Sequence, residues 1–166
     1  MQVNNWNAIA AMSENRVIGL GNRLPWRIPA DMDWFTSATN GQILVMGRKT
    51  LESLQVLHPQ NTYIVLTRNQ DYRADMANIQ AIHDVAHIPA TDPAGRSIWI
   101  CGGGEVYRQT LSRCRNLYLT TIKECCEGDT FFPAFEDAFL LAETLQEDSR
   151  MTIRRYQNKY DGGQGS

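Results

Sequence analysis

Three short runs of apolar, largely β-branched or aliphatic residues are continuous rather than alternating. They are Gln42–Met46 (QILVM), Thr62–Thr67 (TYIVLT) and Ile98–Cys101 (IWIC). Strands that are covered on both faces have this pattern, as in a parallel or mixed sheet between helices. No other feature of the sequence restricts the possible fold so strongly.

Helix-like segments separate these runs, and the alternation predicts an α/β fold with right-handed crossovers. The expected helices are Ala30–Thr39, Thr50–Leu54 and Gly104–Cys114, and two further strands are expected at Trp6–Met12 and Asn116–Ile122. At the end of the chain, Ala142–Leu145 and Thr152–Tyr160 predict an antiparallel pair joined near Asp148. The length of 166 residues suits about one domain. We expect that domain over residues 1–160, and a flexible tail over 161–166.

The charge balance excludes several classes of partner. Sixteen basic and 18 acidic residues give a net charge of −2, which argues against nucleic acid and against a polybasic membrane tether. No apolar run approaches the roughly 20 residues that span a bilayer, and the first residues lack a secretory pattern. The four cysteines, Cys101, Cys114, Cys125 and Cys126, have no zinc-ligand spacing. We therefore expect a cytoplasmic protein with reduced thiols and no metal.

The segment Leu24–Phe35 (LPWRIPADMDWF) places Asp31 just inside a helix start, with Phe35 one turn later on the same face. Two interpretations of Asp31 stay open at this point. An acid in a first turn interacts favourably with the helix dipole. A carboxylate at the edge of an apolar pocket can instead accept two parallel hydrogen bonds from an amidine-like ligand edge. Asp33 is expected to face solvent.

Two turns that follow strands suggest a phosphate-bearing ligand. Gly47, Arg48, Lys49 and Thr50 follow the first run, and backbone N–H groups and cations together suit an anion. A solvated basic turn is the alternative. The segment Cys101–Tyr107 (CGGGEVY) lets the backbone approach a ligand closely, although a flexible turn is also possible and the GxGxxG fingerprint is absent.

These segments, followed in order by Glu127–Pro133 (EGDTFFP), resemble dihydrofolate reductase of the bacterial type over about Ile9–Pro133. The resemblance weakens towards Tyr160. It implies a central eight-stranded, mostly parallel sheet flanked by helices, with an antiparallel C-terminal strand. It also implies an NADPH-dependent oxidoreductase that transfers a hydride to C6 of a dihydropterin, most simply 7,8-dihydrofolate.

The resemblance also assigns residues to the substrate. Asp31 would bind and polarise the pterin, and Thr120 would hydrogen-bond behind it. Leu24 and Trp26 would belong to the loop that closes over the nicotinamide, and Tyr107 would lie near that ring. The proton would come from a water admitted past Leu24. The apolar walls would be formed by Ile9, Ala11, Met32, Phe35, Leu54 and Cys101.

For the cofactor, the resemblance implies that Arg48, Lys49 and Thr50 hold phosphates. Thr67 and Arg68 would take the 2′-phosphate, which favours NADPH over NADH. Gly102 and Gly103 match a pair joined by a cis peptide, and Asp129 matches a residue that steadies the loop Gly19–Leu24. The remaining implied cofactor contacts are Ala11, Ile18, Gly19, Asn22, Gly47, Cys101, Gly104, Glu105, Val106 and Tyr107.

One departure from the family concerns the outer end of the substrate. Asn61 stands where folate-type members carry an arginine that clamps the glutamate carboxylate, and neither 28–47 nor 51–67 contains Lys or Arg. Dihydrofolate could be reduced with poorer tail binding, or the substrate could be another dihydropterin such as dihydromethanopterin. Arg27 could also compensate. A second departure is a shorter turn between the last two strands, which could alter the closing loop.

Two functions of other classes stay open at this stage. One is a reductase that acts on a pyrimidine or ribityl intermediate. Asp31 argues against this function, because its carboxylate suits the edge of a pterin. The other is a catalytically silent module that senses NADPH or pterin. In each case the expected partner is a small molecule, and the chain is expected to be a monomer.

Overall fold

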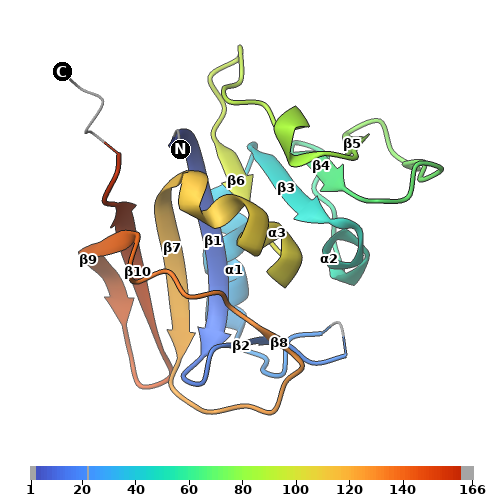
Figure 1. The fold of residues 1–166 in the computed structure, drawn as a ribbon. Coiled ribbons are helices and arrows are strands. Elements are labelled where there is room, and N and C mark those ends of the chain that lie inside the picture. Colours follow the sequence, from blue (N-terminus) through green and yellow to red (C-terminus); the bar gives the residue numbers. More distant parts are fainter. Residues whose placement is uncertain (1–2, 22, 162–166) are drawn as a thin grey trace.

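The computed structural model describes residues 3–21 and 23–161. Its main sheet has eight strands: β1 (Asn4–Ser13), β3 (Ile43–Gly47), β4 (Thr62–Leu66), β5 (Ile79–Ile82), β6 (Ile98–Ile100), β7 (Cys114–Ile122), β9 (Phe139–Glu147) and β10 (Met151–Asn158). Their order across the sheet is β5-β4-β3-β6-β1-β7-β10-β9 (Figure 1). All pairings are parallel except those of β10 with β7 and β9. The expected fold class is therefore confirmed.

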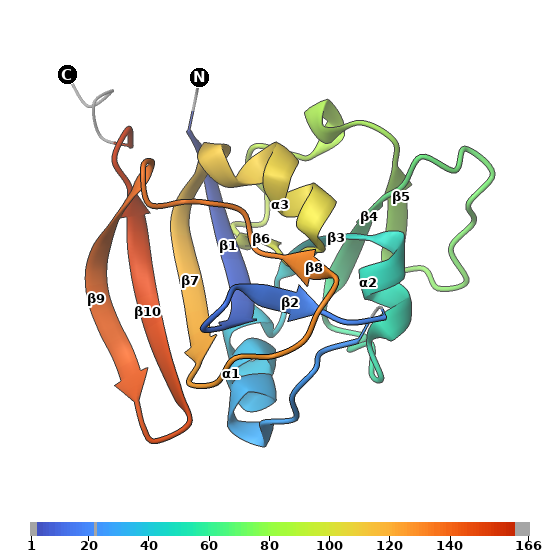
Figure 2. The ribbon, with the colours of Figure 1, turned by 60° about the horizontal axis from the view of Figure 1, so that its bottom comes forward.

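Three α-helices connect the strands: α1 (Pro29–Thr39), α2 (Arg48–Ser53) and α3 (Gly104–Thr110). Single 3-10 turns occur at Val85–His87 and Leu111–Arg113. Pro29 opens α1, where its fixed φ suits the first helical position. Helices α1 and α3 cover opposite faces of the sheet (Figure 2). No helix among the described residues is long and apolar enough to cross a membrane.

The central strands are apolar on both faces, as their continuous runs predict. Along β3, Ile43 and Val45 belong to one buried cluster, whereas Leu44 and Met46 belong to another. The first cluster lies with α3, since it includes Val106 of that helix. Because β3 is covered on both faces, it can present only its end and the following turn to a ligand.

Several elements differ from their expected bounds. The third helix ends at Thr110, and Cys114 opens β7 instead of ending the helix. Cys114 is fully buried, and a buried apolar residue fits the inner face of a strand as well as that of a helix. Helix α2 begins at Arg48, two residues earlier than predicted. The short strand β5 and the separate pair β2 (Val17–Gly19) and β8 (Thr130–Phe131) were not predicted.

The antiparallel C-terminal pair is confirmed, with a tight turn between β9 and β10. The Asp148 carboxylate accepts hydrogen bonds from the backbone N–H groups of Arg150 and Met151. Lys123, just after β7, donates to the Asp148 carbonyl at 2.6 Å. Asp161, the first residue of the expected tail, forms an ion pair with Arg115 at 3.0 Å. Residues 162–166 lie outside the described part of the chain.

Candidate active site

The Asp31 carboxylate is buried in the first turn of α1. The residue is 8% exposed, and its backbone N–H donates to the Ile28 carbonyl at 3.0 Å. Burial raises the pKa of Asp31, while the nearby Thr120 hydroxyl and Trp26 indole lower it in part. Asp33, two residues on, is exposed as expected. The acid of this segment that turns inward is therefore Asp31.

Two polar atoms beside Asp31 are buried without a full hydrogen bond. The indole Nε1 of Trp26 and the Oγ1 of Thr120 approach the carboxylate, yet neither has a hydrogen-bond partner of good geometry among the described residues. Thr120 reaches this place because β7 pairs with β1, which sets it opposite Ala11. Buried polar groups without partners are rare in folded proteins. A ligand or a water molecule at this place can complete their hydrogen bonding.

The residues expected to line the substrate come from several elements. Phe35, Leu54 and Cys101 pack against the same buried cluster, and burial raises the pKa of the Cys101 thiol, so it is neutral. Ala11 packs against the buried cluster that includes Trp26. Ile9 on β1 is buried, whereas Met32 is half exposed. Met32 therefore lies at the rim of this group.

Two glycine turns meet beside this apolar group. The Gly47 N–H donates to the Gly102 carbonyl at 2.8 Å, which joins the turn after β3 to the turn after β6. Gly102 has φ +106°, and a Cβ there would lie 3.0 Å from the Tyr107 ring. A Cβ on Gly103 would lie 3.3 Å from the Thr50 hydroxyl. The Gly102–Gly103 peptide is cis, as the resemblance implied.

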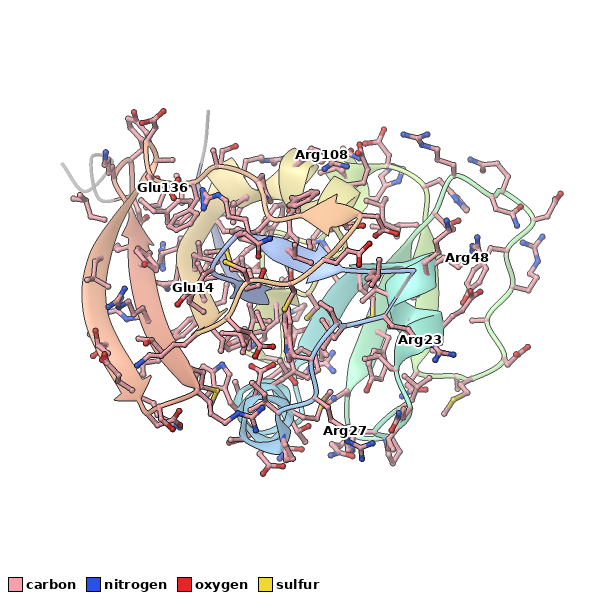
Figure 3. The ribbon with its side chains drawn as sticks, turned by 90° about the horizontal axis from the view of Figure 1, so that it is seen from below. Glu14, Arg23, Arg27, Arg48, Arg108 and Glu136 are labelled. Carbon is pink, nitrogen blue, oxygen red and sulfur yellow. The ribbon has the colours of Figure 1, made fainter. Side chains whose placement is uncertain are left out.

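Basic side chains surround these turns, and two of them are paired with acids. Arg48 on α2 bonds Glu52 at 2.9 Å, and Arg108 on α3 bonds Glu105 at 2.9 Å. Figure 3 labels the two arginines. Arg108 is the main cause of the lowered pKa of Glu105, and Arg68 contributes to it, so Arg68 lies near the start of α3. Lys49 is exposed, and no ion pair joins it to another described residue.

Thr67, just after β4, makes hydrogen bonds with Asn69 and His83. Its hydroxyl accepts from the Asn69 N–H at 3.1 Å, and its carbonyl lies 2.9 Å from Nδ1 of His83. The imidazole ring of His83 therefore lies beside Thr67. His83 follows β5, a strand that the sequence pattern does not predict, so His83 is not expected at this site from the sequence.

The loop after β2 is fixed by Asp129. Its carboxylate accepts from the Gly21 N–H at 3.0 Å, and its own N–H donates to the Gly19 carbonyl at 3.0 Å. The Gly21 N–H is the main cause of the lowered pKa of Asp129. Ile18 is half-buried on β2, and Leu24 is 45% exposed. Asn22, an expected cofactor contact, lies outside the described residues.

Comparison with known proteins assigns the chain to a family. The family model for dihydrofolate reductase matches residues 5–160. The chain belongs to the dihydrofolate reductase family. A dihydrofolate reductase of Buchnera aphidicola is 36% identical over 132 residues, which are 80% of this chain and 79% of that protein. Dihydrofolate reductase type A13 of Escherichia coli is 35% identical over 142 residues, 83% of this chain and 85% of the relative.

A solved structure of the family has the same fold. Dihydrofolate reductase from Enterococcus faecalis, complexed with NADP(H) and RAB-propyl, superposes with a TM-score of 0.82 at 31% identity. The match covers 96% of this chain and 99% of that one. Membership of the dihydrofolate reductase family favours dihydrofolate over dihydromethanopterin, and over a pyrimidine or ribityl substrate.

Proposed function

We propose that this chain catalyses the NADPH-dependent reduction of 7,8-dihydrofolate to tetrahydrofolate. The observation that carries the proposal is the buried Asp31 carboxylate with the Trp26 indole and the Thr120 hydroxyl directed at it. An apolar surrounding with a few convergent polar atoms is typical of a small-molecule site. The relatives' names supply the substrate that fits it.

Asp31 is proposed to bind the pterin through two parallel hydrogen bonds. The ring edge of a pterin presents an N–H and an amino group side by side, and a carboxylate accepts both. Because the pKa of Asp31 is raised, the ligand's donors also stabilise the ionised form that they require. Thr120 and Trp26 can complete the polar surroundings, directly or through water. Ile9, Ala11, Phe35, Leu54 and Cys101 would enclose the ring, with Met32 at the rim.

The glycine turns and their cations fit an anionic dinucleotide. Gly102 and Gly103 have no side chains, so their backbone groups are open to a ligand. The Thr50 hydroxyl lies close to Gly103 and can add a hydrogen bond. We assign the phosphates to Arg48, Lys49 and Thr50, and the 2′-phosphate to Thr67 and Arg68. When bound, NADPH supplies the hydride from C4 of its nicotinamide. The other expected contacts are Ala11, Ile18, Gly19, Asn22, Gly47, Cys101, Gly104, Glu105, Val106 and Tyr107.

The chain's contribution to the chemistry is orientation and charge. The buried Tyr107 ring, packed under Gly102, would support the cofactor ring. Leu24 would cover the two reacting rings and admit the water that delivers the proton to N5. The Asp31 charge stabilises positive charge that develops on the pterin. A monomeric, cytoplasmic state without a nucleic-acid partner stays a prediction.

The direct test follows the loss of the NADPH absorbance band with 7,8-dihydrofolate, and identifies the product by mass. We expect one NADPH consumed for each tetrahydrofolate formed, and much slower turnover with NADH. Ligand-induced shifts in melting temperature without turnover would instead support the silent sensor and contradict this function.

A further inference from the structure

We infer that the enzyme holds its substrate by the ring system and leaves the outer, glutamate end without a buried cation. This inference rests on the proposed function and specifies its substrate class. Dihydropterins that lack the glutamate should be reduced about as efficiently as dihydrofolate. The observations that support it are the burial and hydrogen bonding of Asn61 and the hydrogen bonds and charges of the side chains around it.

The Asn61 side chain is buried and hydrogen-bonded within the protein. It is 3% exposed, its Oδ1 accepts from the Gly41 N–H at 2.6 Å, and its Nδ2 donates to the Tyr63 hydroxyl at 3.3 Å. The bond from Gly41 joins the end of α1 to the segment before β4, and the bond to Tyr63 fixes Asn61 at the start of β4. A ligand carboxylate therefore cannot use the Asn61 side chain without breaking buried hydrogen bonds.

The two side chains that bridge α1 to this segment, Gln60 and Asn40, are neutral as well. Gln60 donates to the Asn40 side chain at 2.7 Å, so α1 and the segment 54–61 are bridged at their outer end by two amides. Val56 on that segment is 63% exposed. The segments 28–47 and 51–67, which supply Phe35 and Leu54, contain no Lys or Arg.

Two arginines of this part of the chain, Arg96 and Arg73, are engaged elsewhere. Arg96 bonds Asp92 at 3.0 Å and the Thr62 hydroxyl at 2.7 Å. Arg73 donates to the backbone carbonyls of Gln70 and Tyr72. Each guanidinium would have to give up these bonds to serve a substrate carboxylate.

Arg27 is the competing candidate, because it is exposed and no ion pair joins it to another described residue. It lies on the loop that leads into α1 (Figure 3). Asn40 follows the other end of that helix, whose 11 residues extend about 16 Å at 1.5 Å per residue. Arg27 is thus at the Asp31 end, whereas the amide bridge is at the opposite end.

The size of the expected effect follows from the missing pair. A partly buried guanidinium–carboxylate pair would favour the glutamate-bearing substrate by about 10- to 100-fold. Without it, two substrates should differ by less than about threefold in kcat/KM. They are 7,8-dihydrofolate and 7,8-dihydropteroate, which has the same ring system but ends in a benzoate carboxylate and lacks the glutamate.

The test measures kcat/KM for both substrates with the intact chain, and repeats it in Gln60→Arg with Gln60→Met as the matched neutral control. We expect near-equal values in the wild type and in Gln60→Met. In Gln60→Arg we expect about a tenfold preference for dihydrofolate, caused by a lower KM.

Three results would contradict the inference. A tenfold preference for dihydrofolate in the wild type would overturn it, and loss of that preference in Arg27→Met would assign the clamp to Arg27. An unchanged ratio in Gln60→Arg would contradict the placement of the substrate's outer end at the amide bridge. Absence of turnover with both substrates would contradict the reductase function itself, and the inference would fall with it.

Discussion

The hydroxyl of Tyr107 donates a 2.6 Å hydrogen bond to the backbone carbonyl of Ile9. This bond fastens α3 to β1 at the point where the glycine turn and the apolar wall of the substrate site meet. Burial raises the pKa of Tyr107 well above its ordinary value, so the phenol stays protonated and remains a donor at neutral pH. The residue is thus a structural link as well as a wall of the site.

Replacing Tyr107 by Phe tests that link. The ring stays, but the bond to the Ile9 carbonyl is lost, so we expect the free energy of unfolding to fall by about 1–2 kcal/mol. Urea denaturation measures this loss. The kcat should fall less than about tenfold, because the ring that faces the cofactor is kept. A larger loss of kcat with unchanged stability would show that the hydroxyl takes part in the reaction.

The raised pKa of Asp31 predicts an unusual dependence of stability on pH. The folded chain keeps the Asp31 proton at pH values where the unfolded chain, with a pKa near 3.8, has released it. The free energy of unfolding contributed by this group therefore falls as pH rises from the unfolded pKa through the raised folded pKa. Asp31→Asn cannot ionise, so it should be more stable than the wild type at neutral pH and lose this advantage in acid. Thermal unfolding across the pH range measures the difference, and a less stable variant at neutral pH would contradict the prediction.

Asp129 should control the loop that precedes α1. Asp129→Ala removes the acceptor for the Gly21 N–H, and Arg23 in that loop is exposed to trypsin. We expect cleavage after Arg23 to become several-fold faster, and kcat/KM to fall by about two- to tenfold. The exposed Asp137 provides the matched control, since Asp137→Ala should leave both rates unchanged. Equal cleavage rates in the two variants would contradict the role of Asp129.

Glu105 places a negative charge beside the cations assigned to the cofactor. Glu105→Gln frees Arg108 from its ion pair and reduces the charge seen by Arg68. We expect NADPH to bind about two- to fivefold more tightly, with the gain lost at high salt. Fluorescence titration of NADPH measures this, with Glu143→Gln, which breaks a pair with Arg155 on the C-terminal strands, as control. Weaker binding in Glu105→Gln would indicate that the ion pair itself shapes the site.

The sequence predicts the central strands well, because residues such as Leu44 and Val45 are apolar on consecutive positions and must be buried on both faces. It does not predict β2 and β8, since strands of three and two residues are fixed by their pairing and not by their own pattern. Cys114 was misplaced because one apolar residue fits a helix or a strand equally well.

The site was predictable in part for a similar reason. Asp31 follows a helix-start signal, and the glycine triplet follows a strand, so each can be predicted from the sequence immediately around it. The approach of Thr120 to Asp31 depends on the register of β7 against β1, which places Thr120 opposite Ala11. The hydrogen bonds that bury Asn61 also depend on contacts between distant segments, so composition alone could show only that a cation was missing.

The most direct test of the assigned role of Asp31 compares Asp31→Asn with the wild type in two measurements on the same samples. These are the rate of NADPH-dependent reduction of 7,8-dihydrofolate and the dissociation constant of NADPH. We predict that turnover falls by about 10²- to 10³-fold while the NADPH constant changes less than about twofold. Turnover equal to that of the wild type would contradict the central claim that the Asp31 carboxylate binds the reacting ring.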